Sequence, residues 1–155
     1  METTALIISI ISLLSTSAIA VYEFMESRNI NETNLEAETF NILFRSLMLK
    51  ELPMARAKLM FNQEHRLVGA DDVINIISLM RKNSVYYQYV DVNFYNKIRT
   101  KLLEIEDVLQ EASDKQYIGE DQTSFFIKLG TLMKDLYNIL QCKYLGRKIK
   151  SVKHD

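Results

Sequence analysis

The sequence predicts an all-α protein in which a single N-terminal transmembrane helix is followed by a four- or five-helix bundle. Three observations lead to this fold class: an N-terminal stretch without charge, apolar residues that recur at helical spacing, and only four Gly and one Pro in 155 residues. So few turn-forming residues disfavour a hairpin-rich β fold. We expect an anchor over residues 1–28, a soluble helical bundle over residues 29–146 and a basic tail over residues 147–155.

The anchor is predicted from the segment between Glu2 and Glu23, which holds no ionised side chain. Residues 3–22 of this segment would form a helix of about 30 Å, the thickness of the hydrocarbon core of a bilayer. Two alternatives remain. Ala18 and Ala20 match the small-x-small pattern of a signal-peptide cleavage site, although the N-terminus lacks the usual positive charge. The Ser and Thr residues of the segment would also suit a buried core helix.

The orientation of the anchor is predicted from the basic residues beside it. The residues before the span carry none, whereas Arg28 follows its far end, so we expect the bundle in the cytoplasm. Small residues recur along the span in steps of three or four and would form one helical stripe that packs against another span. The alternative is that their hydroxyls bond back to the preceding turn. This stripe consists of Ala5, Ser9, Ser12, Thr16 and Ala20.

The first bundle helices are predicted from their end signals. After a polar hinge at residues 29–34, Thr33 and Glu36 form a capping box that opens a helix ended by Pro53. A short helix is expected over residues 54–62, with Ala57 and Phe61 directed inward. Asp71 is expected to cap the next helix, which ends near Lys82.

The later bundle helices are predicted from their periodicity. In residues 92–112 the apolar positions follow steps of four and three, which predicts an amphipathic helix. Residues 124–145 show the same spacing and predict a second such helix, which ends at Gly146. Between these helices and the earlier ones, residues 85–90 combine β-branched and aromatic side chains that also suit a strand. Because no partner strand is evident, we interpret them as a helix end that leads to a cap at Asp91. The tyrosines around them would either close the bundle or form an interface.

The search for catalytic or metal-binding motifs is largely negative. The two His residues lie outside any His-Glu-x-x-His motif, and the scattered Gly residues form no phosphate-binding loop. Glu64, His65, Asp71 and Asp72 are better explained as loop and capping residues than as metal ligands, and Cys142 as a small packing residue. We therefore expect neither a cofactor nor a metal.

One pattern resembles an enzyme signature. Arg147 and His154 are separated by six residues, a spacing similar to the Arg-x(4–6)-His motif of HEPN ribonucleases, small all-helical domains that often act as toxins. The resemblance covers eight residues at the C-terminus. It implies that His154 would act as an acid or base while Arg147 steadies phosphate charge. A frayed basic tail explains the same residues more simply.

The C-terminal tail carries a concentration of positive charge in a chain whose net charge is -1. Near a membrane these side chains would rest on anionic lipid, whereas a solvated terminus is the simpler alternative. Nucleic acid is not favoured, because the tail lacks interleaved aromatic residues apart from Tyr144. The candidate lipid contacts are Lys143, Arg147, Lys148, Lys150 and Lys153.

These features together favour a non-catalytic, membrane-anchored interaction or regulatory module that holds a partner-binding bundle at the cytoplasmic face. The expected partners are the lipid bilayer, a protein of unknown identity and further copies of the chain. The alternatives are a membrane-tethered ribonuclease-like toxin that uses Arg147 and His154, and a small oligomeric membrane effector.

Overall fold

The computed structural model describes the backbone of residues 2–146 and the side chains of residues 17–28, 30 and 33–146. The chain divides into two units, residues 1–38 and 39–155. The first unit belongs to helix α1 (Glu2–Asn41). The polar hinge and the capping box predicted at residues 29–36 are wrong, because α1 runs through them. No Gly or Pro precedes Pro53, so nothing in this stretch forces the helix to stop.

The second unit begins with the last three residues of α1 and continues with a π-helix, η1 (Ile42–Glu51), which is followed directly by α2 (Leu52–Arg56). The Leu52 N–H donates to the carbonyl of Leu47, five residues earlier, as in a π-helix. Pro53 lies in the first turn of α2, a position where proline is well tolerated. The helix predicted to start at residue 54 thus begins two residues earlier, at Leu52, and the predicted helix end at Pro53 is wrong because η1 continues directly into α2.

The helix predicted over residues 54–62 ends early, at Arg56, and an antiparallel hairpin of β1 (Met60–Phe61) and β2 (Leu67–Val68) follows. Its turn is stabilised by Asn62, whose Oδ1 accepts the N–H groups of Glu64 and Arg66 at 3.0 and 2.9 Å. His65 takes the left-handed conformation with φ +61° that glycine usually supplies. Ala57 is exposed and Phe61 is half-buried, so the inward direction predicted for Ala57 is wrong.

Helix α3 (Ala70–Ser84) begins one residue after Gly69 and not at the predicted cap, Asp71, which lies in its first turn. Gly69 has φ +85°, and a Cβ there would stand 2.9 Å from the backbone oxygen of Lys58. Both the positive φ and the backbone crowding therefore favour glycine at the residue that precedes α3. The last turn of α3 carries Arg81 and Lys82, as predicted.

A short helix, α4 (Tyr87–Val90), connects α3 to α5 (Val92–Asp114), and α6 (Glu120–Tyr144) completes the part of the chain that the structure describes. The Asp91 carboxylate accepts the Phe94 N–H at 3.0 Å, which confirms the predicted cap. The apolar residues that recur in steps of four and three along α5 are all 0% exposed. These fully buried residues are Ile98, Leu102, Ile105, Leu109 and Ala112.

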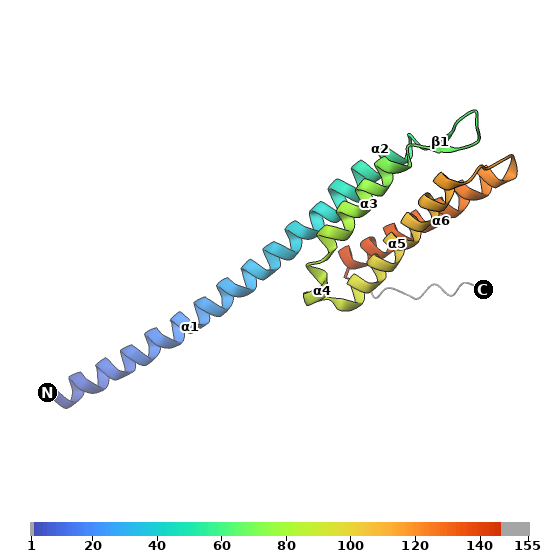
Figure 1. Ribbon diagram of the computed structural model, residues 1–155. Helices are drawn as coiled ribbons and strands as arrows, with labels where there is room; N and C mark the ends of the chain where they lie inside the picture. The colour runs from blue at the N-terminus through green and yellow to red at the C-terminus, as the bar shows by residue number, and fades with distance from the viewer. Residues whose placement is uncertain (1, 147–155) are drawn as a thin grey trace. The chain divides into compact units, whose positions relative to one another are not determined.

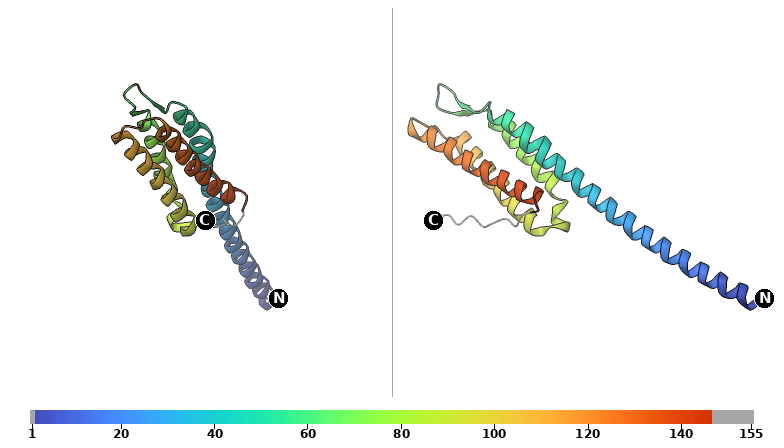
Figure 2. Two further views of the ribbon diagram at one scale, coloured as in Figure 1. Left: turned by 90° about the vertical axis from the view of Figure 1, so that its right-hand side faces the viewer. Right: turned by 180° about the vertical axis from the view of Figure 1, so that it is seen from behind.

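Within residues 39–146 these helices form an up-and-down four-helix bundle (Figures 1 and 2). Helix α3 packs against the η1–α2 stretch and α5, and α5 packs against α6. The fourth side is joined by aromatic rings, with the centroids of Phe44 and Tyr137 5.9 Å apart. The structure thus confirms a mostly helical, all-α protein with a helical bundle.

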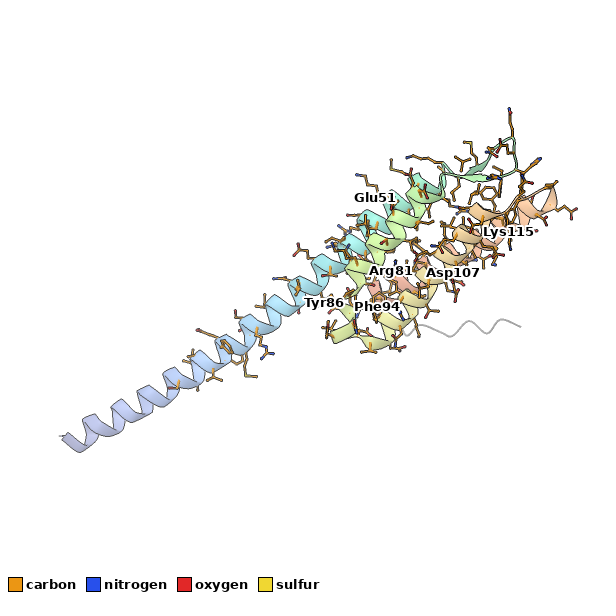
Figure 3. All side chains as sticks on the ribbon, viewed as in Figure 1. Glu51, Arg81, Tyr86, Phe94, Asp107 and Lys115 are labelled. Atoms are coloured by element: carbon orange, nitrogen blue, oxygen red, sulfur yellow. The ribbon has the colours of Figure 1, made fainter. Side chains whose placement is uncertain are left out.

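Ion pairs join neighbouring helices around this apolar core. Arg81 of α3 contacts Glu106 of α5 at 2.8 Å, and Lys101 of α5 contacts Asp135 of α6 at 3.5 Å. Figure 3 shows Arg81 at the middle of the bundle and Lys115 near its hairpin end. These pairs are partly exposed, so the buried apolar residues supply most of the stability.

Candidate functional site

Helix α1 exposes a group of apolar side chains at the C-terminal end of the predicted span. Phe24 is 71% exposed and Tyr22 67% exposed. Other exposed apolar residues of this group are Ile19, Val21 and Met25. An apolar group of this size on a helix is typical of a surface that contacts lipid or another protein.

The predicted span falls mainly on residues whose side chains the structure does not describe. Ala5, Ser9, Ser12 and Thr16 of the small-residue stripe lie outside the described side chains, and Ala20 is exposed. Within residues 17–28, 30 and 33–146, no helix is long and apolar enough to cross a bilayer. The transmembrane helix therefore stays a prediction from the sequence.

The α4 end of the bundle gathers an aromatic and charged cluster. Tyr87 and Phe94 are buried and meet edge to face, with ring centroids 4.7 Å apart. The Lys143 ammonium lies 5.3 Å from the Tyr87 centroid and 3.0 Å from Asp91 Oδ2. Figure 3 shows Phe94 and Tyr86 at this end. Most of the predicted tyrosine group thus closes the bundle.

The charge at Asp91 is stabilised by its surroundings. Burial raises the pKa of its carboxyl group, but the Phe94 N–H and the Lys143 ammonium together lower that pKa below the usual value of 3.8. Asp91 therefore remains ionised over the physiological range, in contact with Lys143. The arrangement is structural: the carboxylate caps one helix and holds the end of another.

Beside this cluster an apolar surface faces solvent. Tyr89 is 81% exposed, Val90 54% and Val92 55%. Tyrosine on a rigid helix end is favoured at protein interfaces because it offers a large ring and a hydroxyl at small entropic cost. We take Tyr89, Val90 and Val92 as the α4 surface, the candidate partner-binding site of the bundle.

The predicted C-terminal site residues are mostly beyond the part that the structure describes. Lys143 is half-buried against Asp91 and two aromatic rings. The remaining candidates, Arg147, Lys148, Lys150, Lys153 and His154, lie outside the described residues. The nuclease and lipid-contact hypotheses for the tail therefore remain predictions.

The residues considered as metal ligands or as a reactive thiol lie apart from one another in the structure or contact other groups. Asp72 pairs with Lys58 at 2.8 Å, and His65 Nδ1 lies 3.3 Å from Gln122 Nε2. Cys142 is half-buried on α6. Among residues 17–28, 30 and 33–146, His, Cys, Asp and Glu side chains form no group of three that would hold a metal ion.

Sequence reasoning missed one arrangement, the contact between Arg56 of α2 and Gly130 of α6. A Cβ at Gly130 would stand 3.2 Å from Arg56 Nη2. The signal was present in the sequence, because a glycine inside an otherwise strongly periodic helix costs about 1 kcal/mol relative to alanine. Such a glycine indicates a close approach by another group.

The fold and these surfaces define a helical-bundle protein with an N-terminal helix that carries an uncharged segment. The chain matches none of the known family models, and no curated protein or solved structure shows significant similarity to it.

Proposed function

We propose that this chain is a membrane-anchored interaction module whose bundle is held at the cytoplasmic membrane face and binds a protein partner there. One observation carries the proposal: no ionised side chain occurs between Glu2 and Glu23. Residues 3–22 lie within helix α1. At about 1.5 Å per residue they match the hydrocarbon thickness of a bilayer.

Two further features support the anchor and its direction. The exposed Tyr22 ends the uncharged segment and the exposed Phe24 lies just beyond it, and aromatic side chains favour the interface of a bilayer. Arg28 comes next, and basic residues are retained on the cytoplasmic side. The small-residue stripe from Ala5 to Ala20 would let two spans approach closely, so the module is proposed to self-associate.

The partner is proposed to bind the α4 surface. Tyr89 projects from a short helix held on the core by buried Tyr87, so the surface is presented on a rigid support. Tethering raises the local concentration of any membrane-associated partner without additional contacts. No catalytic group is needed for this function.

The anchor is tested by membrane extraction of the full-length chain. In the first variant, Ile11→Arg with Leu14→Arg, two charges near the middle of the span each cost about 3 kcal/mol. The matched control, Ile11→Ala with Leu14→Ala, keeps the segment uncharged. We expect wild type and control to remain in the membrane pellet after alkaline carbonate treatment, and the Arg variant to be released. Release of all three proteins would contradict the anchor.

The α4 surface is tested by photo-crosslinking in cells. A photoreactive residue replaces Tyr89, and in the control it replaces Asn138, which is exposed on α6. We expect a discrete protein adduct from position 89 that disappears when Val90→Ser and Val92→Ser are added. An adduct from position 138 alone would place the partner elsewhere on the bundle.

A further inference from the structure

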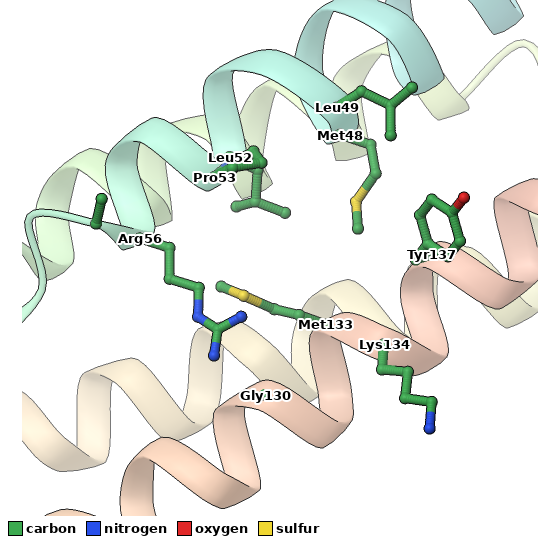
Figure 4. A pocket seen from close by; sticks show the side chains of 10 residues that line it. Met48, Leu49, Leu52, Pro53, Arg56, Gly130, Met133, Lys134 and Tyr137 are labelled. Carbon is green, nitrogen blue, oxygen red and sulfur yellow. The ribbon is translucent and has the colours of Figure 1, made fainter.

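A hollow lies between α6 and the η1–α2 stretch, on the side of the bundle that aromatic rings join (Figure 4). Its volume is about 550 Å³, within the range of about 300 to 1,000 Å³ typical of small-molecule sites. Most of its lining is apolar, with Met48 and Leu52 on one side and Met133 on the other. Methionine side chains adapt their shape to an apolar guest.

The hollow is bounded at both ends. At one end Tyr137 contacts Phe44, with ring centroids 5.9 Å apart. At the other end the Arg56 side chain crosses toward Gly130 (Figure 4). Gly130 and Tyr137 are separated by seven residues, about 10 Å along the helix axis. The short distance between these ends suits a short, compact ligand.

The charge of the lining is positive. Arg56 and Lys134 are its charged residues, and no carboxylate lines it. Among the described residues neither side chain forms an ion pair. Figure 4 shows the Arg56 guanidinium at the mouth and the Lys134 ammonium directed away from it. A guanidinium offers paired N–H donors that match the two oxygens of a carboxylate.

We propose that this hollow binds a medium-chain carboxylic acid. The alkyl chain would lie against Met48, Leu52 and Met133, and the carboxylate would accept hydrogen bonds from Arg56. Gly130 gives the guanidinium room to reach the mouth of the hollow. The proposal concerns residues of the bundle and is independent of the anchor.

The test is a titration of the full-length chain with decanoate, observed through ¹³C-labelled methionine methyl groups. We expect the signals of Met48 and Met133 to shift and saturate. Met80, fully buried in the core, and Met60, on the hairpin, should remain unchanged. The titration is run on the chain in phosphatidylcholine nanodiscs. If the chain does not bind membranes, the same titration is run in buffer without lipid.

Two variants and one analogue test the role of the charge. Arg56→Gln should weaken decanoate binding about tenfold or more, because a hydrogen bond to a charged group is lost. Lys134→Gln, the matched control, should leave the affinity near that of wild type. Decanol should bind wild type about as weakly as decanoate binds the Arg56 variant.

A third variant fills the space without removing charge. Gly130→Leu replaces a poor helix former and should abolish the shifts at Met48 and Met133 while the protein stays folded. Shifts confined to Met25, or equal affinities for decanoate and decanol, would overturn the proposal. The first result would mean partition into the bilayer, and the second an apolar hollow without selectivity for anions.

Discussion

Lys143 Nζ lies 3.0 Å from Asp91 Oδ2, so the last turn of α6 is tied to the residue that caps α5. The same ammonium stands over the rings of Tyr87 and Phe94, 5.3 and 5.6 Å from their centroids. One side chain thus joins three elements, α4, α5 and α6. The α4 surface keeps its shape because these contacts hold its base.

Removing the Asp91 side chain should destabilise the bundle. Asp91→Ala loses both the helix cap and the ion pair, and we expect a cost of about 1 to 2 kcal/mol in the free energy of unfolding. Asp91→Asn should cost less, because asparagine also caps helices well. Urea unfolding followed by circular dichroism measures both. Equal losses for the two variants would show that the cap contributes nothing.

The contribution of Asp91 to the free energy of unfolding should decrease at acid pH. The pKa of this carboxyl is lowered in the folded state, so its stabilising effect is fully present above the ordinary value of 3.8. The effect is lost as the pH falls through the lower, folded value. The stability difference between wild type and Asp91→Asn should therefore shrink in that window. A difference that stays constant through acid pH would contradict the ion pair.

Lys101 should show the opposite dependence, at alkaline pH. Burial lowers its pKa, but Glu104 and Asp135 raise it above the ordinary 10.5. The stabilisation is therefore present below 10.5 and is lost as the pH rises through the folded value. We expect the advantage of wild type over Lys101→Met to decline there. Unfolding curves at successive alkaline pH values test this, with Lys82→Met as the exposed control.

Gly69→Ala should be costly because of both conformation and crowding. A left-handed alanine costs about 1 to 2 kcal/mol, and its Cβ would press on the Lys58 carbonyl at 2.9 Å. Gly146→Ala is the control, since Gly146 has φ +62° but nothing within 4 Å of the added atom. The excess loss in the Gly69 variant, read from thermal unfolding, measures the crowding. Equal losses would disprove it.

The aromatic contact between η1 and α6 should also be measurable. Phe44→Ala removes a buried ring that contacts Tyr137 and Tyr144, and we expect a loss of about 3 kcal/mol or more. Phe44→Leu keeps most of the apolar volume and should cost about 1 kcal/mol. Ile42→Ala changes a more exposed neighbour and should cost less than Phe44→Ala. An equal loss at Ile42 would mean that the rings do not hold the two helices.

The sequence predicted the parts of the fold that depend on periodicity. The buried stripe of α5 and the cap at Asp91 follow from spacing and local hydrogen bonding, which are encoded within one helix. The hairpin at residues 60–68 could not be found in this way, because His65 takes a conformation that usually requires glycine. The close approach of Gly69 to the Lys58 carbonyl was also not visible in the sequence, because the two residues come together only after folding.

The candidate sites were predictable to a smaller extent. An uncharged stretch is visible in sequence because length and charge are local properties. The hollow beside Arg56 forms between two helices that are far apart in the sequence, so no local pattern predicts it. The one sequence feature that indicated the hollow was Gly130, a glycine in the middle of a periodic helix.

The most direct test of the proposed function is protease protection of a C-terminally tagged chain, with the mature N-terminus sequenced from the same material. For a cytoplasmic module on an uncleaved anchor, the tag should be shielded in intact cells and digested after lysis, and the membrane-bound chain should begin unprocessed. A chain that begins at Val21, or a tag digested from outside intact cells, would contradict that account and indicate an exported bundle.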